Sequence, residues 1–344
     1  MSYPNAITSE SELDELLSRP HECVVELMRA LPGDIMLLGV AGKMGVSMAQ
    51  LAVRAINAAG VKKRVYGVSR FTNPAMRNAL EEAGITTIAC DLLAQTQIAS
   101  LPHVDNLIYL AGRKFGTDAE ADLTWVMNVL VPGLICERFS GSRIVAFSTG
   151  CVYPLVPVTS HGCHESVPPE PVGEYAQSCL GRERIFQYYS RTHGHPVCLL
   201  RLNYAIDLRY GVLHDIAKMV WQEQPVTLSV PVFNAIWQGD ANARALLSLP
   251  LCASPARVLN LTGPEIISVR SVAMQFGELM RRQVHFADDS GAVAYLNDAS
   301  TAMSLFGPPS VPLNRMIDWT AHWVMSGGRS LEKPTHFAVN TGRY

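Results

Sequence analysis

Three glycines between an apolar segment and a helical pattern could hold a phosphate group. The apolar run from Ile35 to Leu38 has the length of a strand, and Gly39, Gly42 and Gly45 separate it from an alanine-rich helical pattern. Such a turn favours glycine because it needs positive φ and because a pyrophosphate must approach bare backbone. The first helical turn adds unpaired N–H groups and a partial positive charge. The spacing predicts a dinucleotide-binding turn, although an ordinary strand-to-helix turn would look similar.

The end of the second predicted strand bears on which dinucleotide binds. Residues 64–68 read as a strand, which ends in Ser69 and Arg70. In a dinucleotide fold this strand end meets the adenosine ribose, where an acidic residue selects NAD and an arginine accommodates the 2′-phosphate of NADP. No acidic residue stands here, so the sequence favours NADP over NAD. The alternative is that Arg70 is a solvated loop charge.

A loop predicted over residues 150–174 carries titratable side chains. His161 and His164 lie beside Cys163 and Glu165. Imidazole titrates near neutrality, and these residue types can bind zinc. Histidines in such loops more often form hydrogen bonds or line a pocket, so we predict no metal site. We expect the loop to face the substrate pocket, where either histidine could act as a general acid or base.

The composition excludes several classes of protein. Of the 344 residues, 48% are hydrophobic and 17% are charged, which is typical of a globular protein. The net charge of −2 gives no electrostatic basis for binding nucleic acid or an anionic membrane. There is no signal-peptide pattern, and no apolar run approaches the roughly 20 residues that span a bilayer. Eight scattered cysteines without a C-x-x-C pair suit a reducing compartment. We therefore predict a cytoplasmic protein that binds a small molecule.

Strands alternate with helices through the first part of the chain. The predicted strands are residues 35–38, 64–68, 85–89, 106–110, 143–147 and 197–201. Two long helices are predicted over residues 118–139, with Pro132 inside, and 174–192. This alternation predicts an α/β fold with a parallel sheet covered by helices on both faces. Ligands of such sheets bind at the carboxyl ends of the strands.

The sequence divides into three predicted regions. Residues 1–33 form a helical extension of two short helices, the first capped by Thr8 or Ser9 and the second opened by Pro20. Residues 34–206 form the dinucleotide-binding domain, and 197–201 is its last clear strand. Residues 207–344 form mainly a smaller substrate-binding lobe, with segments that return to the core.

Several short motifs follow one another in a fixed order. They are Gly39-x-x-Gly42-x-x-Gly45, Asp91-Leu92, Leu110-Ala111-Gly112, Asn128 in W-V-M-N-V, Ser148-Thr149-Gly150-Cys151-Val152-Tyr153, Trp237-Gln238-Gly239-Asp240, Asn260-Leu261-Thr262-Gly263 and Ile317-Asp318-Trp319. Over residues 34–325 their order and spacing resemble the extended short-chain dehydrogenase/reductases, or NAD-dependent epimerase/dehydratase family. This resemblance implies a Rossmann-type doubly wound parallel sheet with a smaller C-terminal lobe.

The resemblance also implies residue roles. The cofactor-binding set is Gly39, Gly42, Lys43, Met44, Gly45, Ser69, Arg70, Asp91, Leu92, Ala111, Gly112, Asn128, Ser148 and Tyr175. Within it, Lys43 is expected to face phosphate or solvent. Thr149 takes the catalytic hydroxyl position and Tyr175 the catalytic phenol position. Members of the family commonly form homodimers through the long helix after strand four and the tyrosine helix.

The expected catalytic helix departs from the family pattern Y-x-x-x-K. It reads Tyr175-Ala-Gln-Ser-Cys179, so the lysine is absent. A free tyrosine has a pKa near 10, which a neighbouring ammonium and the cationic nicotinamide normally lower. Cys179 lies on the same helical face and cannot replace that charge. Arg182, two turns from Tyr175, could lend a positive field, but we expect it to form a surface or interface ion pair.

Two further departures concern the substrate. Gly150 and Cys151 stand where sugar-nucleotide dehydratases of the family carry an acidic pair, which disfavours a 4,6-dehydratase. The family segment R-x-x-N-x-Y-G-P is replaced by Arg201-Leu202-Asn203-Tyr204-Ala205-Ile206-Asp207, which favours a free sugar, sugar acid or polyol over a nucleotide-sugar. The candidate substrate contacts are His161, His164, Arg182, Asn203 and Tyr204.

The sequence therefore predicts an NAD(P)-dependent oxidoreductase or epimerase that acts at a carbinol carbon of a carbohydrate-like substrate. Thr149 would hydrogen-bond the reacting oxygen and Tyr175 would transfer its proton. Two alternatives stay open. One is a cofactor-binding sensor or scaffold that has lost catalysis, and the other is a lyase or isomerase that uses the cofactor transiently.

Overall fold

A parallel sheet forms the centre of the molecule. The computed structural model describes residues 3–114, 120–287, 290–333, 335–339 and 341–342. Within these residues the sheet has seven strands in the order β11-β7-β5-β4-β1-β2-β3. The strands are β1 (Ile35–Leu38), β2 (Val65–Ser69), β3 (Thr86–Ala89), β4 (Asn106–Tyr109), β5 (Arg143–Thr149), β7 (Val197–Leu202) and β11 (Arg257–Leu261).

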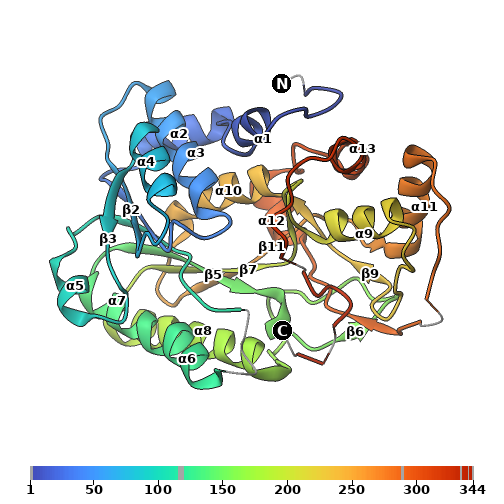
Figure 1. Cartoon of the computed structure of the whole chain (residues 1–344). Helices are drawn as coiled ribbons and strands as arrows, with labels where there is room; N and C mark the ends of the chain where they lie inside the picture. Colours follow the sequence, from blue (N-terminus) through green and yellow to red (C-terminus); the bar gives the residue numbers. More distant parts are fainter. Residues whose placement is uncertain (1–2, 115–119, 288–289, 334, 340, 343–344) are drawn as a thin grey trace.

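Helices cover both faces of this sheet, which confirms the predicted doubly wound α/β fold (Figure 1). On one face lie α2 (Glu22–Ala30), α3 (Gly45–Ala59) and α10 (Gln238–Leu247), and on the other lie α7 (Val131–Arg138) and α8 (Gly173–His193). Successive side chains of a strand point to opposite faces. Leu37 accordingly packs in the first layer and Leu38 in the second, and both are fully buried.

The remaining elements are short or belong to the C-terminal region. The helices are α1 (Glu10–Leu17), α4 (Pro74–Glu82), α5 (Gln95–Ser100), α6 (Ala121–Trp125), η1 (Val126–Leu130), η2 (Gly150–Val152), α9 (Val212–Trp221), η3 (Leu249–Leu251), α11 (Val269–Met280), α12 (Ser300–Phe306) and α13 (Leu313–Met325). The short strands are β6 (Val156–Pro157), β8 (Ala205–Ile206), β9 (Val232–Phe233), β10 (Ile236–Trp237), β12 (Ile267–Ser268) and β13 (Val293–Ala294). Of these, α9, α11 and α13 share a second hydrophobic core.

The prediction that residues 197–201 are the last clear strand of the sheet was wrong. β11 pairs in parallel with β7, from Arg257 beside Cys198 to Leu261 beside Leu202.

Asn260 on β11 connects this strand to two other segments of the chain. Its side-chain amide donates to the carbonyl oxygens of Cys163 (2.8 Å) and Asp298 (2.9 Å).

The long helix predicted over residues 118–139 is divided. Residue 118 lies outside the described residues, and the helix continues from α6 through the π-helical turn η1 into α7. Pro132 is the second residue of α7, directly after the π turn, and the helix continues through it. The π turn carries Asn128, whose amide joins the main chain of Arg113 and the hydroxyl of Ser178.

The N-terminal helices contact both cores. Ser9 caps α1 as predicted, since its hydroxyl accepts a hydrogen bond from the Glu12 N–H. Buried residues of α1 belong to the core of the C-terminal helices, whereas those of α2 belong to the core beside the sheet. Pro20 precedes α2, which begins at Glu22. Among the residues described, no helix combines the length and apolarity needed to cross a bilayer.

Candidate functional site

Two cavities join into one cleft at the carboxyl ends of the strands. One, of about 330 Å³, lies at the ends of β2 and β3, and the other, of about 270 Å³, extends to Tyr175. Both are lined by Gly39, Gly42 and Leu110, so they meet at the glycine turn. This is the edge of a parallel sheet where ligands bind.

The first cavity contains many of the predicted cofactor residues. Its lining includes Gly39, Gly42, Ser69, Arg70, Asp91, Leu92, Ala111 and Gly112. A carboxylate oxygen of Asp91 accepts a hydrogen bond from the N–H of Leu93 (3.0 Å), which fixes the turn after β3. The ends of strands β2, β3 and β4 thus surround a polar space beside the glycine turn.

The glycine turn has the geometry that a pyrophosphate requires. Gly39 has φ of +85°, and a Cβ there would lie 2.8 Å from the main-chain nitrogen of Ala111. A Cβ at Gly45 would collide with the carbonyl of Val40. Helix α3 starts after Met44, and its first turn carries neither an acidic residue nor a side-chain cap among the described contacts. Its first N–H groups can therefore receive a phosphate, so the residues fit a dinucleotide.

Thr149 and Tyr175 meet in the second cavity. Tyr175 shares a side-chain hydrogen bond with Thr149 and another with the thiol of Cys179. Strand β5 supplies Thr149 and helix α8 supplies Tyr175, and both line the cavity. The sequence-predicted pair of hydroxyl groups is therefore brought together at the end of the cleft.

The surroundings of Tyr175 keep its proton in place. Burial raises the pKa of this phenol well above its ordinary value of 10.0, and the thiols of Cys179 and Cys151 raise it further. The charge of Arg182 and the hydrogen bond from Thr149 act in the opposite direction. Without a bound coenzyme, the phenol of Tyr175 therefore stays protonated at neutral pH.

Two lysines line the same cavity. The Nζ of Lys114 lies 5.7 Å from the centroid of the Tyr175 ring. The Nζ of Lys43 donates a 3.0 Å hydrogen bond to the Ala205 carbonyl and lies 3.7 Å from the centroid of the Tyr210 ring. Lys43 thus faces the C-terminal segments and not solvent, which corrects that part of the expectation. Burial lowers the pKa of Lys43 to about 7 and also lowers the pKa of Lys114.

Sequence reasoning missed Lys114. It lies two residues after Leu110-Ala111-Gly112, in the segment that leaves the carboxyl end of β4. The rule that ligands bind at these strand ends was a signal that could have identified it. Met44, Gly45 and Ser148, all predicted, line this cavity as well.

A buried ion pair lies behind the cavity wall. Nη2 of Arg201 is 2.7 Å from Oε2 of Glu183, and the two side chains are 3% and 0% exposed. The hydroxyl of Ser148 donates a 2.5 Å hydrogen bond to the same carboxylate. This network fixes the end of β5 next to Thr149.

Arg182 is buried, so the expectation of a surface or interface ion pair was wrong. Its guanidinium donates to the carbonyl of Phe147 (2.8 Å) and to Oδ1 of Asn128 (2.5 Å). Neither Arg182 nor Asn128 lines the two cavities. Both lie outside the two cavities, where their hydrogen bonds connect β5, η1 and α8.

The predicted substrate contacts separate into two groups. Asn203 and Tyr204 line the second cavity, as the sequence suggested. His161 and His164 are exposed and line neither cavity, which corrects the expectation that their loop faces the pocket. The reason is that the loop packs elsewhere: His164 contacts Thr301 (3.2 Å) and Glu165 (3.2 Å) beside α12. The described residues contain no group of three or more side chains placed to bind a metal.

Comparisons with known proteins agree with this geometry. The family model described as "NAD dependent epimerase/dehydratase family" matches residues 35–206. No curated protein matches the chain in sequence.

Solved structures of low sequence identity share the fold. UDP-glucuronic acid 4-epimerase of Bacillus cereus, in complex with UDP-glucuronic acid and NAD, has a TM-score of 0.69 at 18% identity, over 85% of this chain and 99% of that one. DesIV, the dTDP-glucose 4,6-dehydratase of Streptomyces venezuelae, has a TM-score of 0.72 at 18% identity, over 85% and 97%. UDP-glucose 4-epimerase of Thermus thermophilus, in complex with NAD, has a TM-score of 0.67 at 19% identity, over 85% and 99%.

Proposed function

The chain belongs to the NAD-dependent epimerase/dehydratase family, and from this premise we propose that it is an NAD(P)-dependent oxidoreductase or epimerase. Its reaction would take place at a carbinol carbon of a carbohydrate-like substrate. The observation that carries the proposal is the single cleft, which connects the glycine turn at Gly39 with the hydrogen-bonded Thr149 and Tyr175. The adenosine half of the dinucleotide would lie near Arg70 and Asp91, and the nicotinamide half near Thr149.

A nicotinamide bound here would supply a hydride acceptor or donor. The hydroxyl of Thr149 would hydrogen-bond the oxygen on the reacting carbon and so fix its position. The Tyr175 oxygen, which shares a hydrogen bond with Thr149, would take the proton from a substrate hydroxyl or return it to a carbonyl. Phe147 and Leu202 supply apolar walls that limit the access of water.

The charge of the cavity supports a substrate that carries a carboxylate. Lys43 and Lys114 are among its lining residues, and the described lining includes no aspartate or glutamate. Asp207 and Asp215 favour the charged form of Lys43, but neither carboxylate lines the cavity, so the lining itself favours an anion. Within the predicted class of sugars, sugar acids and polyols, we therefore propose a sugar acid.

The adenosine end supports a preference for NADP. Arg70 lines the cavity at the end of β2, and no acidic residue follows this strand before Asn73. A ribose 2′-phosphate would therefore meet a guanidinium and no carboxylate at this strand end. The three similar structures named above contain NAD, so the preference for NADP is a proposal about this chain alone.

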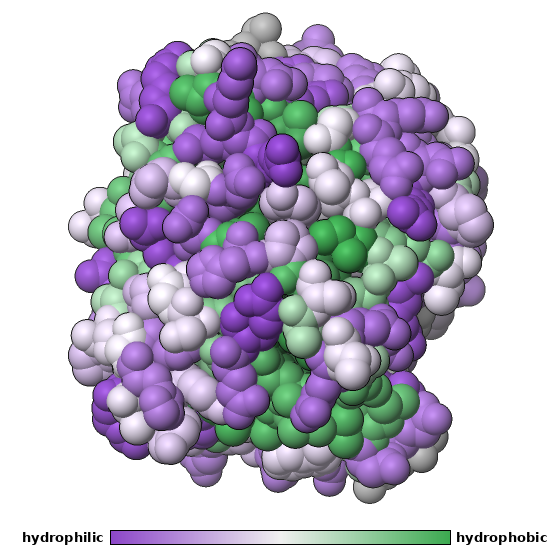
Figure 2. All heavy atoms as spheres, turned by 90° about the vertical axis from the view of Figure 1, so that its left-hand side faces the viewer, coloured by the Kyte–Doolittle hydropathy of each residue, from purple (hydrophilic) through white to green (hydrophobic). Residues whose placement is uncertain are grey.

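We also propose a homodimer in the cytoplasm. Helices α6 to α8 expose large apolar side chains, including Trp125 (37% exposed), Leu130 (53%) and Tyr188 (48%). Figure 2 shows apolar side chains gathered at the lower end of the molecule, where Figure 1 places these helices. Pairing of two such faces would remove this surface from water.

The proposed cytoplasmic location is supported by the eight cysteines, which are all free thiols, as is usual in a reducing compartment.

Calorimetry and a substrate screen test the proposed function. We expect NADP to bind, and we expect sugar acids to change the absorbance of the coenzyme or, for an epimerase, to be converted to an isomer that chromatography detects. Tyr175→Phe should lower turnover by at least about a hundredfold and leave NADP affinity unchanged. Absence of affinity for both NADP and NAD would exclude the function, and equal turnover in the variant would exclude the role of Tyr175.

The second candidate is a coenzyme-binding sensor. The observation that favours it is the raised pKa of Tyr175 together with a cysteine at position 179. Such a protein would keep the dinucleotide site without a competent base. Tight NADP binding combined with no absorbance change and no isomer from any sugar or sugar acid would support this alternative.

A further inference from the structure

The phenol of Tyr175 needs a cation if it is to act as a base near neutral pH. It is enclosed at the cavity wall, and the two nearby thiols of Cys179 and Cys151 add no positive charge. Helix α8 offers only Cys179 one turn after the tyrosine, and this side chain is 1% exposed. Arg182, also on α8, lowers the pKa of Tyr175 but does not line the cavity, so a charge within the cavity must come from another element.

A lysine from another element lies beside the ring of Tyr175. Lys114 follows β4, and its ammonium lies 5.7 Å from the centroid of the Tyr175 ring. Lys114, Thr149 and Tyr175 all line one cavity, so the ammonium and the two hydroxyl groups face the same space. The ammonium lies over the ring, and a positive charge close to a phenol favours its ionised form.

Resting on the proposed function, we propose that Lys114 acts as a positioning residue that supplies the positive charge for Tyr175, in place of a lysine on helix α8. The charge arrives from the segment after β4, across the cavity, and not from the helix that carries the tyrosine. When the phenol loses its proton, the adjacent ammonium stabilises the phenolate. Lys114 keeps its own proton and acts through Tyr175.

The surrounding groups are consistent with this role. Tyr175 is influenced by Cys179 and Arg182 from its own helix and by Cys151 and Thr149 from the end of β5. Lys114 is influenced by Cys151, by Cys179 and by Asp215 of α9, and all three favour its charged form. Burial opposes that form and lowers the pKa of Lys114. A neighbouring phenolate would restore the pKa, because the two opposite charges stabilise each other.

Arg182 does not supply the same effect. Its guanidinium also lowers the pKa of Tyr175, but it hydrogen-bonds to Phe147 and Asn128 below the site. Arg182 does not line the cavity, so a substrate or coenzyme would not meet it. Arg182 acts on Tyr175 from outside the cavity, whereas Lys114 lines the cavity in which the substrate would exchange its proton with Tyr175.

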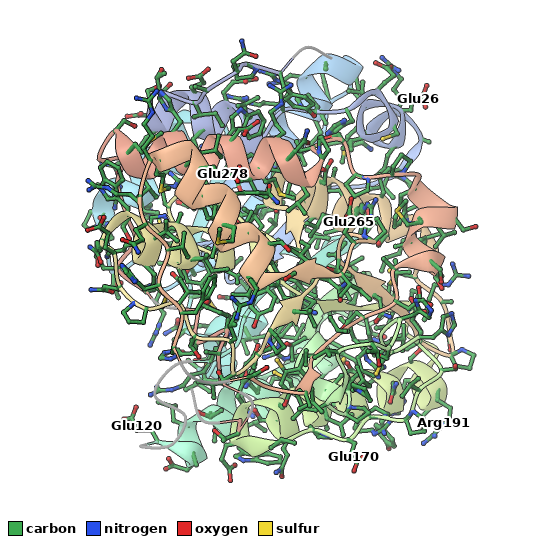
Figure 3. All side chains as sticks on the ribbon, turned by 90° about the vertical axis from the view of Figure 1, so that its right-hand side faces the viewer. Glu26, Glu120, Glu170, Arg191, Glu265 and Glu278 are labelled. Atoms are coloured by element: carbon green, nitrogen blue, oxygen red, sulfur yellow. The ribbon has the colours of Figure 1, made fainter. Side chains whose placement is uncertain are left out.

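A matched control is available beside Lys114. Arg113 precedes it in the chain and carries the same charge, but its guanidinium pairs with Glu120. Figure 3 shows Glu120 at the outer edge of the molecule, with its side chain pointing away from the core. Arg113→Met therefore removes one positive charge from the same segment but leaves the charges that line the cavity unchanged.

The titration of Tyr175 tests the proposal without a substrate. Tyrosine labelled with ¹³C at Cζ reports phenolate formation by NMR, and loss of one signal in Tyr175→Phe assigns Tyr175 among the 11 tyrosines. With saturating oxidised NADP, and again without coenzyme, we expect Lys114→Met to raise the apparent pKa of Tyr175 by about one unit or more. Arg113→Met should leave it within about 0.3 unit. Equal titration of wild type and Lys114→Met would overturn the proposal.

A rescue experiment separates a charge effect from damage to the fold. Lys114→Arg keeps the charge and should leave the pKa of Tyr175 at its wild-type value. In the double variant Lys114→Met/Cys179→Lys, the new lysine on α8 should return the pKa towards the wild-type value. A pKa that stays raised in both folded variants would contradict the proposal. If the screen finds no substrate, the proposed function fails, but these titrations still decide whether Lys114 controls Tyr175.

Discussion

Glu183 and Arg201 form an ion pair behind the end of β5, with 2.7 Å between Oε2 and Nη2 and almost no exposure of either side chain. The pair joins helix α8 to strand β7, and Ser148 donates to the same carboxylate. Because Ser148 precedes Thr149, the ion pair helps to hold the cavity wall in position.

Replacing Glu183 with glutamine should destabilise the protein strongly. The variant leaves the guanidinium of Arg201 buried without its counter-charge, so we expect a loss of about 3 kcal/mol or more in the free energy of unfolding. Urea unfolding followed by circular dichroism measures the change. Glu81→Gln is the control, since Glu81 pairs with Arg77 on the exposed surface, where water screens the pair and its loss should change the stability much less. Equal losses in the two variants would contradict the role of burial.

Gly42→Ala should weaken coenzyme binding more than it weakens the fold. A Cβ at Gly42 would lie 3.1 Å from the Gly39 carbonyl oxygen and would project into the shared part of the two cavities. We expect roughly tenfold weaker NADP binding by calorimetry, with a small change in melting temperature. Gly133→Ala, on α7, has a nearest contact of 3.9 Å and should leave the affinity unchanged.

Arg70→Ala should reduce discrimination between the two coenzymes. Loss of the guanidinium at the end of β2 removes a charge-assisted contact with a 2′-phosphate and leaves the NAD contacts intact. We expect NADP affinity to fall by about tenfold and NAD affinity to change by less than about twofold. An equal loss for both coenzymes would place Arg70 at the pyrophosphate, and no loss for either would place it outside the site.

The affinity for a sugar acid should fall as the pH rises through about 7. The pKa of Lys43 is about 7, so its ammonium is present below that pH and absent above it. Between pH 6 and 8 we expect up to about tenfold weaker binding of glucuronate to the NADP complex, measured by calorimetry. Glucose, which is uncharged, serves as the control and should show no such trend. Lys43→Met should abolish the pH dependence, and a trend that persists in it would exclude Lys43 as the cause.

Leu130→Glu should disrupt the proposed homodimer. Leu130 is 53% exposed on η1, within the apolar face of helices α6 to α8. A charge in such a face must be desolvated when two copies pair. Light scattering should show a dimer for the wild type and a monomer for the variant. Leu305→Glu is the control, because Leu305 is exposed on α12 and should leave the dimer intact.

The buried parallel strands could be predicted from the sequence because their side chains are apolar on both faces. Runs such as Ile35–Leu38 are nearly continuous in hydrophobicity, and the glycine turn marks where one of them ends. β11 was missed because the C-terminal region has short elements, and a local pattern does not reveal which distant strand it joins.

Parts of the site depended on tertiary contacts that no local pattern contains. The sequence indicated Thr149 and Tyr175, and the structure brings them into contact. It gave no reason to connect Lys114 with Tyr175, because the two come from segments far apart in the sequence, after β4 and on α8. His161 and His164 were assigned to the pocket from their residue types, but the backbone of their loop turns away: the N–H of Cys163 bonds to the Leu296 carbonyl at 2.7 Å.

Strand β11 has a consequence for how the chain can be assembled. Ribosomal synthesis delivers β7 well before Leu261, and until then one edge of the sheet carries unpaired N–H and C=O groups. A fragment that stops at residue 206 would keep this edge bare and could stack with other copies through it. We therefore expect a fragment that ends at residue 206 to aggregate more readily than the full chain.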